Sequence, residues 1–308
     1  MGKVKVQKVE LFPVHNGQTH LFQVTGPRGG IRAYQVPGSQ DPMWSVTTII
    51  SNTVAKPGLY GWYNRQGREA VAERLTPHIG KVLNSHLLQQ ALDEASQRPE
   101  KVRDAAGDLG TRAHELIASY ITSQIDGTAF TTTVPEDLEV VWESFKQWED
   151  SSDIQAYIKS EFAVYSHEHQ YAGSVDVLAR NSEGTYLILD WKTSGKLYDE
   201  MALQVAAYAN AIDGLLRLHF GFQTGQTARW DMWDHIQPWV IRLNKETAEF
   251  EARRVKNPQL ALDGFLNAMN MWHSLGLPGL TPRAKKEIED YFTIPTGLPS
   301  VWGEEKVD

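Results

Sequence analysis

The chain has 308 residues, 41% of them apolar, which is enough to bury a sizeable core. It contains no cysteine, which excludes disulfide bonds, thiolate zinc sites, thiol nucleophiles and cysteine-ligated iron–sulfur clusters. The formal net charge of −8 argues against a protein that coats nucleic acid by charge alone. The sequence shows neither a secretory signal nor an apolar run of the roughly 18 residues that a membrane helix needs, so we expect a cytoplasmic protein.

The absence of thiols also limits the kinds of metal site that the chain can form. Any metal ion has to be held by Asp, Glu or His side chains or by backbone oxygen. This ligand set favours Mg²⁺ or Mn²⁺. A cluster of acidic ligands would also account for part of the negative net charge.

Three segments at the N-terminus predict a small β-meander over residues 1–43. They are rich in β-branched and aromatic residues, and Asn-Gly and Pro-Arg-Gly-Gly turn signals separate them. The first 40 residues are basic, because they carry five Lys and Arg residues against one acidic residue, Glu10.

The remaining elements divide into a domain at residues 44–277 and a C-terminal tail at residues 278–308 that is rich in Pro, Gly and charge. A helical insertion is expected around residues 56–150, interrupted at Pro99 and resumed near residues 107–110. The later part predicts strands at about 157–166, 171–180 and 185–192, a helix at about 199–218, strands near 237–243 and 248–255, and a helix at 258–275.

One helix of the insertion carries a candidate ligand. In the segment GTRAHELIASYITSQ the apolar residues recur at i, i+3, i+4 and i+7, which indicates one buried stripe. His114 lies at the edge of that stripe. A histidine in this position is either a satisfied boundary residue or a metal ligand.

Residues 171–194 place charged side chains within two apolar runs. Asp176 lies in the first run, and Asp190 and Lys192 share one face of the second because side chains alternate along a strand. A loop of three or five residues with Gly184 in the left-handed position places Asp176 opposite Asp190, whereas a two-residue turn separates them. We predict the odd-length loop.

Two opposed carboxylates repel each other, so this register requires a cation. Lys192 can provide it in a buried ion pair without further function. The alternative is a divalent metal site with the lysine beside it. Gln204 and Tyr208, four residues apart on the next helix, share one face, either beside this site or as a surface amide and a core ring.

The motifs GSVD, LILDWKTS and QVAAY, together with GTRAHE and the glutamate of SEFAVYS, resemble the PD-(D/E)XK nuclease superfamily. Within it, the sequence is similar to the RecB-like branch of CRISPR-associated and phage-type exonucleases. The resemblance covers about residues 44–255 and is most specific at 170–210. It implies an α/β fold with a restriction-endonuclease-like core, a central mixed β-sheet flanked by helices.

The resemblance also implies the roles of individual residues. The metal ligands would be His114, Asp176, Asp190 and the backbone carbonyl of Trp191, with Glu161 as a further candidate. Catalysis would depend on Asp176 and Asp190 and on three other residues, with Lys192 orienting and activating the attacking water and with Gln204 and Tyr208 lining the cleft. One or two Mg²⁺ or Mn²⁺ ions would be the cofactor.

The expected function is therefore a metal-dependent DNA exonuclease of recombination, repair or phage DNA processing in a bacterial or phage-infected cell. Its partner would be DNA, as linear ends or single strands, with a recombinase or a single-strand-binding protein as a further candidate partner. A restriction-type or structure-specific endonuclease, a non-catalytic DNA-binding accessory protein and a metalloenzyme for small phosphate esters remain open. Strand polarity and oligomeric state do not follow from the sequence.

Overall fold

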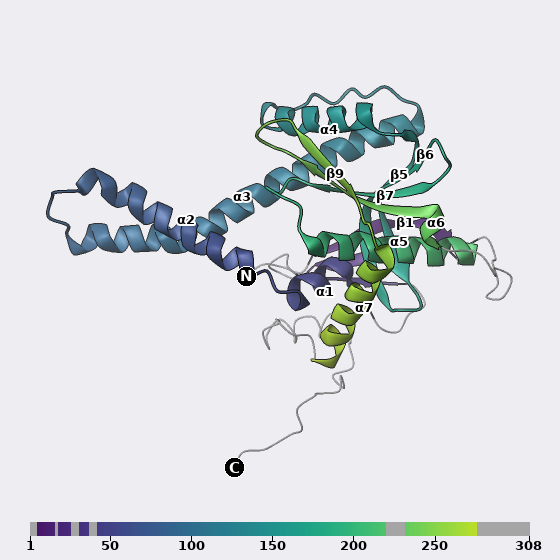
Figure 1. The fold of residues 1–308 in the computed structure, drawn as a ribbon, viewed down its shortest axis with the longest axis horizontal. Coiled ribbons are helices and arrows are strands. Elements are labelled where there is room, and N and C mark those ends of the chain that lie inside the picture. Colours follow the sequence, from purple (N-terminus) through teal and green to yellow (C-terminus); the bar gives the residue numbers. More distant parts are fainter. Residues whose placement is uncertain (1–4, 16–17, 26–30, 37–41, 220–231, 276–308) are drawn as a thin grey trace, which may run out of the picture. The chain divides into compact units, whose positions relative to one another are not determined.

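The computed structural model describes residues 5–15, 18–25, 31–36, 42–219 and 232–275 (Figure 1). The chain divides into two compact units. The large unit comprises Met1–Val54 and His114–Asp308, and the helical unit comprises Ala55–Ala113. Every candidate site residue belongs to the large unit, whereas the predicted tail at 278–308 lies outside the described residues.

The strands belong to one sheet of the large unit. They are β1 (Lys5–His15), β2 (Gln18–Thr25), β3 (Arg32–Gln35), β4 (Met43–Ser45), β5 (Ile154–Ser166), β6 (Tyr171–Asn181), β7 (Tyr186–Lys192), β8 (Ile236–Leu243) and β9 (Phe250–Arg254). The strands and helices predicted from residue 154 onward are confirmed, with boundaries that differ by a few residues.

The helices of the large unit are α1 (Val46–Thr53), the last part of α3 (Ser85–Asp126), α4 (Glu139–Ser151), α5 (Asp199–His219), α6 (Met232–His235) and α7 (Pro258–Ser274), with a 3-10 turn η2 (Glu136–Leu138) before α4. Helix α1 begins at Ser45, whose side chain accepts a hydrogen bond from the Thr48 amide and so caps the first turn. None of the helices in the described ranges combines the length and the apolar run needed to cross a membrane.

The expected fold class, an open central mixed sheet flanked by helices, is wrong. Strands β1 to β4 form an antiparallel meander, as predicted for its first strands, but β4 then pairs in parallel with β6. Strand β1 pairs in parallel with β5, and β5 pairs antiparallel with β6. These pairings close six strands into a ring, a small barrel, and β7, β8 and β9 extend from β6 outside it.

The ring closes because the two ends of β6 have different neighbours along the same edge. Tyr171 and Ala172, at its start, pair with β4, whereas Val177 to Arg180, nearer its end, pair with β7. Both ring-closing contacts involve few residue pairs and join segments more than 100 residues apart. A local pattern in the sequence therefore cannot predict them.

Helices cover the strands that extend from the ring on two sides. Trp191 of β7 packs edge-on against Phe145 and Trp148 of α4, with ring centroids 5.5 and 4.8 Å apart. Asp190, the neighbour of Trp191, faces α5, where Gln204 contacts it. In Figure 1, α4 accordingly lies on one side of β7, with α5 and α7 on the other. Alternation along β7 thus separates an aromatic face from a polar one.

The helical unit contains α2 (Pro57–Leu75), a 3-10 turn η1 (Thr76–His78) and the first part of α3. The predicted interruption at Pro99 is wrong, since α3 is continuous from Ser85 to Asp126. A proline inside a helix removes the hydrogen bond to the carbonyl four residues earlier, here that of Ala95. This carbonyl lies beside Gly67 of α2, where a Cβ atom would stand 3.4 Å from it.

Candidate metal centre

The β6–β7 hairpin has the predicted register. Val177 pairs with Leu189 and Leu178 with Ile188, which places Asp176 opposite Asp190. The Asn181 amide donates to the Thr185 carbonyl at 3.0 Å, so the loop has three residues, and Gly184 has a φ of 85°, the left-handed conformation that was expected. The Asn181 side chain closes the loop by accepting a hydrogen bond of 2.8 Å from the Thr185 amide.

The β5–β6 register adds a third carboxylate to the same row. Ser160 pairs with Val177 and Phe162 with Val175, so Glu161 lies opposite Asp176. We call Glu161, Asp176 and Asp190 the acidic row; its members come from the three adjacent strands β5, β6 and β7. The sequence predicted only the pair formed by Asp176 and Asp190, because Glu161 was placed in the strand without a register.

Glu161 has an unusual backbone conformation. Its φ is 48°, in the left-handed region, although both neighbouring residue pairs keep the strand register. A non-glycine residue in this region costs on the order of 1 kcal/mol or more, and such residues concentrate at functional sites. The left-handed residue redirects the carboxylate without shifting the strand.

His114, Glu161 and Asp176 form a group that can hold a metal ion. One ligand atom from each residue lies within 4.8 Å of the others. His114, which is 27% exposed, reaches from α3 and places Nδ1 at 3.3 Å from Oδ2 of Asp176. The same oxygen accepts a hydrogen bond of 2.8 Å from the Trp191 amide, which fixes the carboxylate relative to β7.

The charges of this group alter the pKa values of its members. Burial and the Asp176 carboxylate raise the pKa of Glu161 to about 8. Burial alone would lower the pKa of His114, but the Asp176 carboxylate outweighs it and raises the pKa to about 9. Burial alone would raise the pKa of Asp176, but the charge and the hydrogen bond of His114 outweigh it, and the pKa is lowered.

Asp190 and Lys192 form the second part of the site. Asp190 is only 2% exposed, and its Oδ2 lies 2.5 Å from Nζ of Lys192. Gln204 donates hydrogen bonds of 2.8 Å to Oδ1 of Asp190 and 3.2 Å to the Tyr208 hydroxyl, and its amide oxygen lies 3.4 Å from Nζ of Lys192. Gln204 and Tyr208 therefore lie beside the acidic row, on the face expected from their spacing.

The structure differs from the predicted ligand set in one respect. Asp190 is not part of the compact group, in which Glu161 takes the third place with His114 and Asp176. Instead Asp190 is paired with Lys192. The contact from Trp191 that the structure shows is its amide donating to Asp176, and the role of its carbonyl stays a prediction.

The donor set nevertheless fits a cation. Glu161 and Asp176 offer carboxylate oxygens and His114 offers an imidazole nitrogen within 4.8 Å of one another, whereas Oδ2 of Asp190 already has the Lys192 ammonium beside it at 2.5 Å. Burial raises the pKa of Asp190 to about 6, even with Lys192 opposing that shift. Burial raises the pKa of two of the three carboxyl groups in the acidic row, Glu161 and Asp190, and the charge of Asp176 adds to both shifts, as expected for carboxylates held close together.

One residue of the site went unrecognised in the sequence. Gly173 lies under the Tyr208 ring, and a Cβ atom at this position would stand 2.4 Å from Cε1 of that ring. Glycine is therefore required for the Tyr208 ring to keep its present position. The only sequence signal was a glycine inside an apolar strand three residues before Asp176, which indicates a close approach of another group.

Comparison of the sequence with models of known protein families gives no match, and comparison with curated proteins gives none either. The functional conclusion therefore depends on the geometry of the site.

Proposed function

We propose that the protein is a divalent-metal-dependent deoxyribonuclease that hydrolyses phosphodiester bonds, acting as an exonuclease on linear ends or single strands. The acidic row beside Lys192 is the observation that carries this proposal. The motif resemblance to RecB-like nucleases supports it and suggests the substrate. The proposal is independent of the expected fold class, since the same chemistry occurs on unrelated folds.

Mg²⁺ or Mn²⁺ is the proposed cofactor. Two carboxylates and one imidazole make an oxygen-rich set of hard ligands, which suits these ions, and the chain has no thiolate to favour a softer one. His114, Glu161 and Asp176 would hold the ion. When bound, it would place positive charge beside the scissile phosphate and make a water acidic enough to attack near neutral pH.

Lys192 would act as a cationic donor in this reaction. Burial opposes its charge, but the Asp190 and Asp176 carboxylates raise its pKa, so its ammonium keeps the proton. We expect this group to orient the attacking water and to donate a hydrogen bond to a phosphate oxygen. Gln204 fixes Asp190 and thereby the position of the ammonium. Water would add to phosphorus and lose a proton to solvent, while the bond to one sugar oxygen breaks and that oxygen takes up a proton from solvent.

The test is degradation of end-labelled linear DNA and of covalently closed circular DNA with Mg²⁺, with Mn²⁺ and with a chelator. Lys192→Ala should lower the rate about 100-fold or more, in line with the loss of a preorganised, charged hydrogen-bond donor. Lys159→Ala is the matched control, because Lys159 of β5 forms its ion pair with Glu10 outside the site. This variant should keep the wild-type rate.

Degradation that persists in the chelator, or an unchanged Lys192→Ala, would contradict the proposal. Cleavage of the closed circle would identify an endonuclease instead. Metal-dependent binding of DNA without turnover would indicate an accessory protein, and hydrolysis of small phosphate esters alone would indicate a metabolic enzyme.

A further inference from the structure

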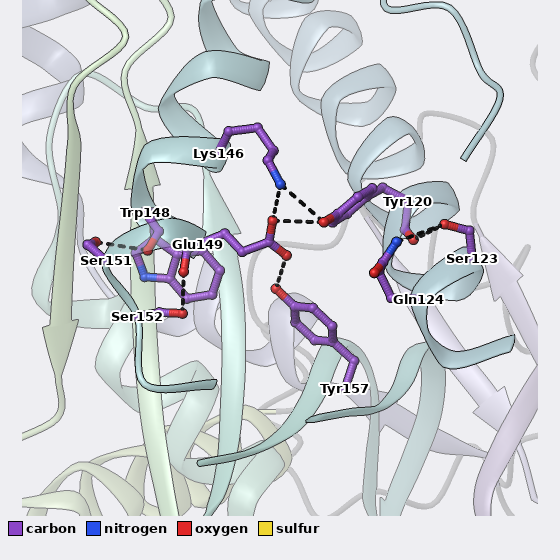
Figure 2. A network of polar contacts seen from close by, with 9 residues as sticks. All are labelled: Tyr120, Ser123, Gln124, Lys146, Trp148, Glu149, Ser151, Ser152 and Tyr157. Carbon is purple, nitrogen blue, oxygen red and sulfur yellow. Dashed lines mark hydrogen bonds and ion pairs between the residues drawn. The ribbon is translucent and has the colours of Figure 1, made fainter. Parts of the chain in front are cut away.

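A second polar network lies in the large unit, and the proposed reaction does not use it directly. Glu149, on the last turn of α4, accepts a hydrogen bond of 2.8 Å from the Tyr157 hydroxyl on one oxygen and one of 2.9 Å from the Tyr120 hydroxyl on the other. Lys146 forms an ion pair with Glu149 and donates to the Tyr120 hydroxyl at 3.1 Å. Figure 2 shows these side chains converging on the Glu149 carboxylate.

The network is built to hold its geometry. Glu149 is 14% exposed, and the Nζ of Lys146 lies 4.7 Å from the centroid of the Tyr120 ring. Burial and the Glu149 carboxylate raise the pKa of Tyr157 well above its usual range, so its hydroxyl remains a donor. The Tyr120 ring also packs against Phe145, with centroids 5.6 Å apart. Charge-assisted hydrogen bonds of this kind are stronger than neutral ones.

The three elements that meet at Glu149 include the two that carry His114 and Glu161. Tyr120 follows His114 by six residues on α3, which is about 9 Å along a helix. Tyr157 precedes Glu161 by four residues on β5. The Glu149 carboxylate therefore connects α3 to β5. Its contact on α3 lies within two helical turns of His114, and its contact on β5 lies four residues from Glu161.

We propose that Glu149 is a positioning residue for the metal centre: by binding Tyr120 and Tyr157 at once, it sets the separation of His114 and Glu161. This inference rests on the proposed metal-dependent function. A ligand group spread over a helix and a strand needs such a connection, because metal affinity falls when its ligands are free to separate. Outer groups that orient metal ligands commonly contribute 10- to 100-fold to affinity.

The experiment measures Mn²⁺ binding by calorimetry, with the unfolding midpoint recorded in the absence of metal. Glu149→Gln keeps the size of the side chain but loses the charge and one good acceptor. We expect its Mn²⁺ dissociation constant to rise about 10-fold, at the lower end of the range for groups that orient ligands. Amide hydrogen exchange in the metal-free protein should also accelerate over residues 112–118 and 158–164.

Asp213→Asn is the matched control. Asp213, whose side chain is 10% exposed, forms an ion pair with Arg217 within α5, nine residues beyond Gln204. We expect it to shift the unfolding midpoint without changing the Mn²⁺ dissociation constant. If Glu149→Gln fails to fold, Tyr157→Phe removes a single hydroxyl and should weaken binding in the same direction.

A folded Glu149→Gln, or Tyr157→Phe in its place, with wild-type Mn²⁺ affinity would overturn the positioning role and leave the metal site intact. A wild-type protein that binds neither Mn²⁺ nor Mg²⁺ would remove the metal site itself, and with it both proposals. Equal weakening in Asp213→Asn would also count against the inference, because the effect would then reflect general loss of stability.

Discussion

At the scale of single residues, the site combines one arrangement that pattern predicts and two that it does not. Asp176 and Asp190 are opposed because strands have a side-chain period of two and the loop length sets the register. The orientation of Glu161 depends on a left-handed backbone angle that no periodicity reports. Asp190 pairs with Lys192 and does not join the compact ligand group. The position of the Lys192 ammonium depends on the conformation of a flexible side chain, which a strand pattern does not predict.

The contact between Gly173 and Tyr208 leads to a prediction at this scale. Gly173→Ala would force the added Cβ into the Tyr208 ring, 2.4 Å from Cε1, so the ring must move away from Gln204. Overpacking of this kind costs about 1–3 kcal/mol. We expect a lower free energy of unfolding in urea and a slower nuclease reaction.

Gly214→Ala provides the comparison, since a Cβ at Gly214 of α5 meets no atom within 4 Å. This change should be neutral or should stabilise the protein by about 0.4–1 kcal/mol. A Gly173→Ala protein as stable and active as the wild type would show that the Tyr208 ring does not need its present position.

At the scale of elements, the hairpin is a platform that α4 and α5 hold from opposite faces. The local elements were predictable because each has its own period and turn signals, as β6, β7 and α5 show. Helix α3 was not, because Pro99 is a strong helix breaker locally and the packing of the helix overrides its propensity.

Support from α4 can be tested with Phe145→Ala. Phe145 is fully buried and packs against Trp191, the residue between Asp190 and Lys192. Removing a buried phenyl ring costs about 3–5 kcal/mol, and the Trp191 ring would lose one of its two aromatic neighbours on α4. The free energy of unfolding should fall by this amount, and Mn²⁺ binding should weaken.

Val140→Ala, on an exposed position of the same helix, should stay within about 0.5 kcal/mol of the wild type. If the two variants have equal stability, the aromatic packing behind β7 contributes little and the platform must be held in another way.

At the scale of the whole molecule, the closed ring shows what single-sequence reasoning leaves out. The resemblance to the PD-(D/E)XK superfamily implied a central mixed sheet flanked by helices, and the meander was correctly predicted but treated as a separate region. Parallel pairing of β1 with β5 and of β4 with β6 joins it to the site-bearing strands. Such pairings depend on which distant edges meet, a property of the folded chain rather than of any segment.

The summed charges of the site predict how stability depends on pH. In the folded, metal-free protein the pKa is raised to about 6 at Asp190, to about 8 at Glu161 and to about 9 at His114. Each group binds its proton more tightly in the folded state, so the stability that these three groups contribute is present at low pH and is lost as the pH rises through these values. The lowered pKa of Asp176 acts in the opposite direction, but only at acidic pH.

Urea unfolding with a chelator between about pH 5 and pH 9 should therefore show decreasing stability, and Glu161→Gln should flatten the profile. Added Mn²⁺ should stabilise the protein more as the pH rises, because the ligands must lose their protons to bind. Identical profiles for the wild type and Glu161→Gln would contradict the charge balance inferred for the acidic row.

Strand β6 belongs to the ring and also pairs with β7, the first of the outer strands. Both pairings are possible because β4 and β7 pair with different parts of the same edge of β6. Adding or removing one residue between Tyr171 and Asn181 would move every later side chain of β6 to the opposite face of the strand. The register with either β4 or β7 would then be lost, while the other pairing was retained. The length of this segment is therefore constrained by two neighbours at once, in addition to the packing of its buried side chains.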